Sequence, residues 1–300
     1  MTIQNFLLRM KIVSQSRSHS NLSTKAGKLP LHNEKLICVI LGAIVCGQLF
    51  SFLIKNFVLS SVIVYSVVSL AFLYFIYIAL KLERKERVKM LVALVLIAQA
   101  ILFFVLYNQM PTSLTFFALH NVDNFILGFR IPPSEYQVLN PVIIVLASPL
   151  LAYLYRIFPS THVTKFCIGM TLCSFGFISL YIPSITSISA YVSPLWMVVT
   201  YLFQSIGELL ISGLGLSMVA SLCPKDKTGF VMGVWYLAAM LAGPIGAIVG
   251  SMTQPNSNSN FTAIQSLHVY GNIFLEIGLF TLTVSCVMWA FSKKLNKIVS

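Results

Sequence analysis

The sequence predicts an all-α integral membrane protein with about eight transmembrane helices, on the evidence of its composition, its long apolar runs and its charge distribution. Of its 300 residues, 57% are hydrophobic and only 9% are charged, and the mean hydropathy is +0.87. A soluble protein of this length must cover its surface with polar groups, and this chain has too few of them. We therefore expect one helical bundle behind a polar N-terminal segment.

Eight apolar runs carry this prediction. Each run approaches or exceeds the ~20 residues that a helix needs to cross the hydrocarbon core. Backbone groups cannot remain unpaired in lipid, so runs of this length are predicted to be helices rather than strands. The predicted spans are residues 36–54, 57–80, 88–110, 140–156, 166–185, 194–222, 229–252 and 268–291.

The net charge of +12 is distributed unevenly over the predicted loops. If the N-terminal segment is cytoplasmic, 18 of the 20 basic residues fall on the cytoplasmic side of an eight-span arrangement, and the other side keeps Lys55 and Arg130. Such a bias over alternating loops is the positive-inside pattern. It predicts that both termini face the cytoplasm, and it accounts for the positive charge without a nucleic-acid partner.

Residues 1–35 form the polar N-terminal segment, which is rich in serine and basic residues. No apolar core precedes a small-residue cleavage site, so the segment does not read as a secretory signal. An organellar transit peptide has a similar composition and stays an alternative. We favour a solvated cytoplasmic arm.

The sequence contains no pattern typical of an enzyme or a metal site. The stretch GLGLSM at residues 213–218 lacks the third glycine of a dinucleotide-binding loop and falls inside a predicted span. The five histidines show no metal-ligand spacing, and the six cysteines form no CxxC pair, so the cysteines are interpreted as small apolar fillers. We expect no enzymatic activity, no metal and no organic cofactor.

Two acidic residues fall within predicted spans, Glu208 and Glu276. A carboxylate near the middle of the bilayer costs about 2.5–3.5 kcal/mol even on lenient insertion scales. Ser212 and Gly215 follow Glu208 by four and seven residues, so they share one helix face with it and suit a water-filled cavity. A Glu208 that is protonated or hydrogen-bonded to a neighbouring helix is an equal alternative. Glu276 lies between large apolar residues, which favours a packing or protonated role.

Small residues recur in the seventh span. Gly229 and Gly233, and Gly243, Gly246 and Gly250 in GPIGAIVG, stand at helical spacing. We interpret them as positions where helices approach one another closely.

From about residue 107 onward, four stretches resemble a known family. They are YNQMPTSLTFFALHNVD (107–123), QVLNPVIIVLASPLLA (137–152), QSIGELLISGLGLSMVASLCP (204–224) and TGFVMGVWYLAAMLAG (228–243). Their order and spacing are similar to those of the seventh, eighth, tenth and eleventh helices of proton-coupled oligopeptide transporters, within the major facilitator superfamily. The likeness is to the bacterial dipeptide and tripeptide permease type, which implies a bacterial inner membrane.

This resemblance implies a domain organisation. Residues 87–300 would form the C-terminal six-helix bundle of the superfamily. Residues 36–86 would be the two extra helices that bacterial members carry before that bundle, and residues 1–35 would be the basic cytoplasmic segment. The chain would then be the C-terminal half of such a transporter.

The resemblance also assigns roles to single residues. Glu208 in QSIGELLIS and Asn140 in LNP match positions that meet the amino terminus of the peptide, and Trp235 in MGVW matches an aromatic that lines the pocket. Asn108 in YNQ stands where many members carry a glutamate that pairs with an arginine of the first helix. The amide at this position puts that salt bridge in doubt. With Ser212, these residues are the predicted substrate-binding set.

The implied function is symport of di- and tripeptides, driven by a proton gradient across the lipid bilayer. The family's ExxER proton-coupling motif and its basic residues for the peptide carboxylate belong to the N-terminal bundle, so we expect the chain to need an N-terminal half as a partner. Two alternatives remain open at this point. The first is a non-transporting membrane protein that keeps the fold as a scaffold or remnant, and the second is a carrier for another solute.

Overall fold

The computed structural model describes residues 33–126, 128–157, 161–253 and 262–299. Most of the predicted cytoplasmic arm, residues 1–32, lies outside the described residues. Contacts within the chain divide it into two units, residues 1–60 and 61–300, which we describe separately. The predicted boundary between the linker helices and the bundle, at residue 86, stays a prediction.

The first unit contains helix α2, Asn33–Lys55, and the first turn of α3, Phe57–Lys81. A short joint links the two helices. There the amide of Asn56 donates from its side chain to the carbonyl oxygen of Phe52 at 2.8 Å, and the Ser60 hydroxyl donates to the carbonyl oxygen of Leu53. From Ile37 onward the side chains of α2 are almost all exposed, as expected for apolar residues that face lipid.

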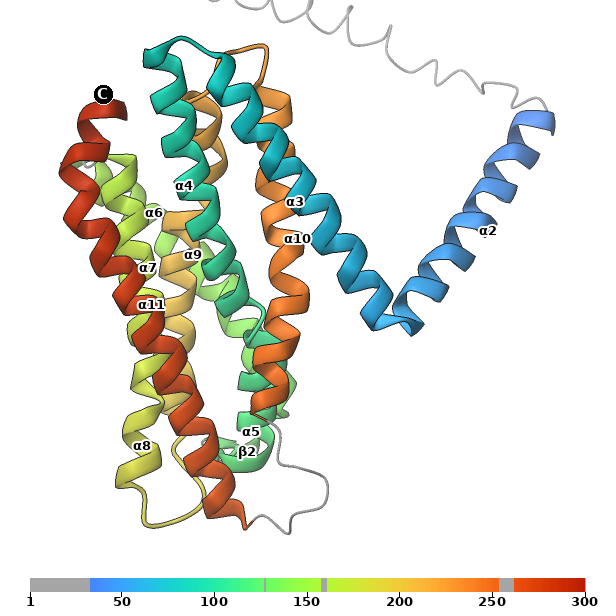
Figure 1. Cartoon of the computed structure of the whole chain (residues 1–300). Helices are drawn as coiled ribbons and strands as arrows, with labels where there is room; N and C mark the ends of the chain where they lie inside the picture. The colour runs from blue at the N-terminus through green and yellow to red at the C-terminus, as the bar shows by residue number, and fades with distance from the viewer. Residues whose placement is uncertain (1–32, 127, 158–160, 254–261, 300) are drawn as a thin grey trace, which may run out of the picture. The chain divides into compact units, whose positions relative to one another are not determined.

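The second unit is a bundle of long helices (Figure 1). After α3 its elements are, in chain order, α4 (Arg84–Tyr107), η1 (Met110–Leu114), α5 (Thr115–Asn121), β1 (Phe125–Ile126), β2 (Phe129–Arg130), η2 (Pro133–Val138), α6 (Leu139–Ile157), α7 (His162–Ser179), α8 (Tyr181–Thr186), α9 (Leu195–Ser221), α10 (Thr228–Met252) and α11 (Ala263–Val299).

All eight predicted spans are confirmed as helices. Within the described residues, eight helical segments are long and apolar enough to cross a membrane, judged by length and composition. Four of them exceed their predicted bounds by several residues, and the fourth and fifth spans begin at Pro133 and His162. The third continues from Arg84 to Asn121, beyond the predicted end at residue 110, and α11 begins five residues before the predicted start at residue 268.

The bundle is organised around close pairs of helices. Helix α7 packs against both α9 and α11, α4 packs against α10, and α6 packs against α9. Large side chains such as Phe103, Phe166, Phe177 and Tyr201 are fully buried between them. The resulting core fixes the faces that α4, α6 and α9 turn toward one another.

A π-helical turn interrupts the third span. Pro111 has no N–H to donate to the carbonyl oxygen of Tyr107, so the regular α-helical ladder cannot continue through it. Instead the Leu114 N–H donates to the carbonyl oxygen of Gln109 at 2.9 Å, the wider spacing of a π-helix. The Gln109 amide side chain donates to the carbonyl oxygen of Gly246 on α10 at 3.1 Å, which ties this turn to the neighbouring helix.

The glycines of α10 fulfil the packing prediction only in part. A Cβ added to Gly246 would lie 3.0 Å from Cβ of Asn108, and one on Gly250 would meet Ser113, so both glycines face the third span closely. The prediction is wrong for the other three glycines, because added Cβ atoms there would meet no atom within 4 Å in the described chain. These open positions are Gly229, Gly233 and Gly243.

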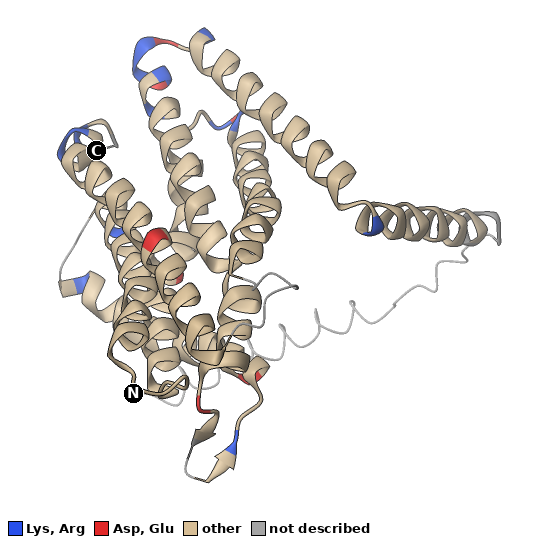
Figure 2. Ribbon diagram, turned by 60° about the horizontal axis from the view of Figure 1, so that its bottom comes forward, with Lys and Arg blue, Asp and Glu red and all other residues tan. Residues whose placement is uncertain are grey.

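Basic residues mark the ends of the helices (Figure 2). In the second unit, the described Lys and Arg residues other than Arg130 stand in the α9–α10 connection, in the helix turns that flank the α3–α4 and α6–α7 connections, or in the last turns of α11. Since successive helices alternate in direction, these connections share one end of the bundle. Arg130 lies at the other end, on the β1–β2 hairpin, whose turn contains Gly128 with φ of +83°. A positive φ of this size favours glycine.

Candidate substrate-binding site

Glu208 and Asn140 meet between α9 and α6. Asn140 is 8% exposed and donates from Nδ2 to Oε2 of Glu208 at 3.0 Å. Ser205, one turn before Glu208 on α9, donates its hydroxyl to Oδ1 of Asn140 at 2.8 Å. The hydrogen bond from Ser205 therefore orients the Asn140 amide, so that its nitrogen donates to the carboxylate of Glu208.

The position of Glu208 follows from the packing of α9. Its neighbour Gly207 faces α7, where an added Cβ would collide with Sγ of Cys173 and lie 2.9 Å from the carbonyl oxygen of Gly169. Gln204 donates to the carbonyl oxygen of Cys173 at 2.9 Å on the same side. Consecutive helical residues differ by about 100°, so with Gly207 against α7, Glu208 points away from that contact toward α6.

Asn140 is placed by the start of α6. The helix begins at Leu139, after the 3-10 turn η2, and Pro141 follows Asn140 in its first turn. Proline is tolerated there because the first N–H groups of a helix have no intrahelical partner. The Asn140 side chain is then free to reach α9.

Tyr107 completes the polar cluster from a third helix. It is the last residue of α4, and its hydroxyl lies 3.5 Å from Nδ2 of Asn140. The sequence analysis did not select Tyr107 or Ser205. Tyr107 does open the YNQ motif, and Ser205 stands three residues before Glu208, a spacing that places both on one helix face.

The side chains of the other predicted site residues form no recorded hydrogen bond with this cluster in the described chain. Trp235 on α10 is 2% exposed and packs where Gly215 leaves room for its ring, with Phe104 edge-on at a centroid distance of 5.9 Å. Asn108 donates from its side chain to the carbonyl oxygen of Phe104 at 2.9 Å. Ser212 is partly exposed on α9, one turn after Glu208. Their assignment to a binding site stays a prediction.

Glu276 is not part of this cluster. Its side chain is exposed on α11 among the described residues, and its packing or protonated role stays a prediction. The Glu208 carboxylate is half-buried, with Asn140 as its recorded hydrogen-bond donor, and the described residues supply no basic partner for it. A carboxylate in this state can accept a cationic group or a proton.

No group of His, Cys, Asp and Glu residues that could hold a metal ion occurs within the described part of the chain.

The fold and this cluster define the class of the protein. It is a multi-pass helical membrane protein with a polar site built from α4, α6 and α9. A family profile described as "PTR2: POT family" matches residues 5–268, and the chain belongs to the POT family.

Curated relatives agree with this family. The chain is 40% identical, over 304 residues, to dipeptide and tripeptide permease A of Pectobacterium carotovorum subsp. carotovorum strain PC1, a match that covers 99% of this chain and 58% of the relative. It is 38% identical to dipeptide and tripeptide permease B of Salmonella typhimurium, over 93% of this chain and 58% of the relative. The chain thus spans less than two thirds of the relatives it matches, and those relatives are permeases rather than enzymes.

Solved structures show the same fold. A bacterial homologue of the human drug peptide transporters PepT1 and PepT2 superposes with a TM-score of 0.76 at 27% identity, over 93% of this chain and 58% of the other. A peptide transporter POT in complex with alafosfalin superposes with a TM-score of 0.70 at 22% identity, over 90% of this chain and 54% of the other. At that identity the second comparison supports the fold alone.

Proposed function

We propose that this chain is the C-terminal half of a proton-coupled transporter for di- and tripeptides in the inner membrane of a bacterium. The observation that carries the proposal is the Asn140–Glu208 pair, with Asn140 oriented by Ser205. A peptide presents an ammonium group at one end, and a half-buried carboxylate with an oriented amide beside it matches that group. The relatives named as dipeptide and tripeptide permeases point to the same substrates.

The proposal includes a partner. A peptide is a zwitterion, so its carboxylate also needs a cationic partner. Among the described residues, no basic residue forms a salt bridge with Glu208, and the cluster around Glu208 contains no basic residue that could bind the peptide carboxylate. Alternating access in this superfamily also needs two halves that move about a site near the bilayer midplane. We infer that a second six-helix half supplies both the cation and the proton-coupling groups, and that the chain has no enzymatic activity of its own.

The test is dipeptide uptake in cells that lack their own permeases. The chain is co-expressed with the N-terminal half of a relative such as the Pectobacterium permease, and uptake of a labelled dipeptide is measured with and without a proton gradient. We expect gradient-driven uptake from the pair and background uptake from the chain alone. Gradient-driven uptake by the chain alone would show that the partner is not needed.

The Glu208→Gln variant tests the site itself. It keeps the shape and hydrogen-bonding capacity of the side chain but removes the negative charge, so we expect uptake by the co-expressed pair to fall at least tenfold. Its abundance in the membrane is expected to be unchanged, because a neutral side chain is easier to bury. Glu276→Gln is the matched control, since Glu276 lies on α11 outside the cluster. If Glu276→Gln abolished uptake and Glu208→Gln did not, the site would be wrongly placed.

A further inference from the structure

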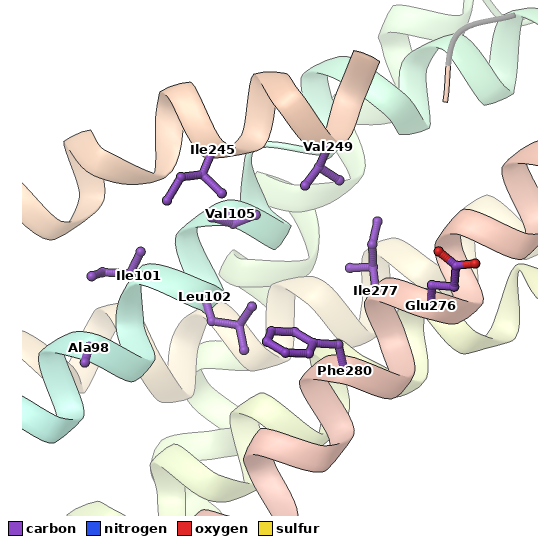
Figure 3. A pocket seen from close by; sticks show the side chains of 9 residues that line it. All are labelled: Ala98, Ile101, Leu102, Val105, Ile245, Val249, Glu276, Ile277 and Phe280. Carbon is purple, nitrogen blue, oxygen red and sulfur yellow. The ribbon is translucent and has the colours of Figure 1, made fainter. Parts of the chain in front are cut away.

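A groove runs between α4 and α11 in the second unit. One cavity of about 420 Å³ has Glu276 at its edge, with Ile277 beside it and residues of α4 and α10 opposite (Figure 3). A second cavity of about 430 Å³ is lined by Gln99 of α4 and Thr283 of α11. Both cavities are lined by Ala98, Leu102 and Phe280, so they form one continuous depression, which we call the α4–α11 groove.

The groove is separate from the candidate substrate-binding site. Its walls come from α4, α10 and α11, whereas Asn140 and Glu208 project from α6 and α9. Helix α11 packs mainly against α7 and α8. Neither Asn140, Glu208 nor Ser205 lines the groove.

Gln99 is the first observation that points to a ligand. It is 5% exposed, and neither its amide nitrogen nor its amide oxygen has a hydrogen-bond partner among the described residues. A buried amide left without partners in an apolar setting is unfavourable, and such groups normally find a protein or solvent partner. A lipid acyl chain in the groove would leave both atoms unpaired, whereas a ligand with a hydroxyl or amide group would pair them.

Glu276 is the second observation. Within the described residues its carboxylate has neither a salt bridge nor a recorded hydrogen bond, although it stands on an α11 face that also exposes Leu279 and Phe280. Ionisable residues within membrane spans usually pair with another group or mark a functional site. Among the residues that line the groove, Glu276 is the one that carries a charge.

The spacing of these groups defines the ligand. Thr283 follows Glu276 by seven residues, which is about 10 Å along a helix at 1.5 Å per residue. The Thr283 hydroxyl donates to the carbonyl oxygen of Leu279 at 2.8 Å, so its oxygen retains acceptor capacity near Gln99. The groove therefore offers a carboxylate at one end, an apolar middle and a hydrogen-bonding pair at the other end.

We propose that the α4–α11 groove binds an amphiphilic amine. Its ammonium group pairs with Glu276, its apolar body covers Ala98, Leu102 and Phe280, and a hydroxyl or amide about 10 Å from the nitrogen bonds at the end of the groove that Thr283 and Gln99 line. The volumes and the mainly apolar lining with a few polar groups are typical of small-molecule sites.

Photolabelling of the 300-residue chain in phosphatidylcholine vesicles tests this proposal. The probe is a seven-carbon chain with an amine at one end, a hydroxyl at the other and a diazirine in the middle, so that its extended length matches the rise between Glu276 and Thr283. The comparison probe is the diol of the same length. We expect the amino alcohol to label α4 and α11 peptides at least fivefold more than the diol, as measured by mass spectrometry, and dodecylamine to compete with it.

Variants identify the groups responsible. Glu276→Gln should reduce amino-alcohol labelling of both peptides to the level of the diol, and Gln99→Leu should reduce it at least twofold. Glu208→Gln is the matched control, because it removes an intramembrane carboxylate outside the groove, and labelling should stay unchanged. Diol labelling of each variant reports whether the groove still folds.

Two results would overturn the proposal. Equal labelling by the amine and the diol would show that the groove only accommodates lipid chains. Labelling that is insensitive to Glu276→Gln would show that the carboxylate does not hold an amine there. Neither result depends on peptide uptake, so the test is independent of the proposed transport function.

Discussion

The Ser205 hydroxyl decides which way the Asn140 amide points. Its proton goes to Oδ1 of Asn140, so the amide nitrogen is left to face Glu208. Side chains held by such a chain of hydrogen bonds lose less freedom when a substrate binds, because they are already oriented. Ser205 is completely buried, so in the proposed site it would act on a substrate only through Asn140.

We predict that Ser205→Ala weakens uptake without abolishing it. A typical intramolecular hydrogen bond contributes about 0.5–1.5 kcal/mol, so uptake at low peptide concentration should fall roughly 2- to 12-fold. The measurement is the concentration dependence of uptake by the co-expressed pair. Ser217→Ala is the control, since that hydroxyl is exposed on the same helix and donates only to the carbonyl oxygen of Leu214. Equal effects of the two variants would contradict the positioning role of Ser205.

At the scale of elements, the contact between α7 and α9 places the site. Gly169 and Gly207 face each other across it, and an added Cβ on Gly169 would lie 3.1 Å from the carbonyl oxygen of Gly207. Helices in membranes associate through close packing of small residues rather than through the hydrophobic effect. This close approach fixes the rotation of α9 and with it the direction of Glu208.

We predict that Gly207→Ala destabilises the bundle. The new Cβ would meet backbone oxygen and a buried thiol, so α7 and α9 would have to separate, at a cost of about 1–3 kcal/mol typical of overpacking. The expected result is a lower midpoint of thermal aggregation in detergent. Gly213→Ala is the control on the same helix, because an added Cβ there meets no described atom within 4 Å. A similar loss of stability in both variants would show that the α7–α9 contact is not tight.

At the scale of the whole molecule, the placement of basic residues predicts the orientation in the membrane. The described loops with several Lys and Arg residues share one end of the second unit, and Arg130 stands at the other. Cytoplasmic loops carry such an excess, which supports the prediction that both termini are cytoplasmic.

Reporter fusions test this topology. Fusions after residues 85, 160, 226 and 296 should report the cytoplasm, and fusions after residues 55, 125, 188 and 258 should report the outer compartment. The expected signal follows from the preference of short basic loops for the cytoplasmic side. Two or more reversed reporters would refute the eight-span topology.

The sequence by itself determined the number of spans, their approximate limits and the presence of an acidic residue in each of two spans. These features are local: about 20 apolar residues are needed to cross the hydrocarbon core whatever the neighbouring helices are. The motifs around Asn140 and Glu208 also identified the family that the profile match then confirmed.

Only the tertiary structure decided which side chains meet. Ser205 and Asn140 are 65 residues apart in sequence, and nothing local indicates that the hydroxyl of one orients the amide of the other. The sequence neighbours of the two intramembrane acids differ, but they do not show that Glu208 faces α6 or that Glu276 lines the α4–α11 groove. The physical reason is that helix periodicity defines faces, while the close packing of particular neighbours decides what each face contacts.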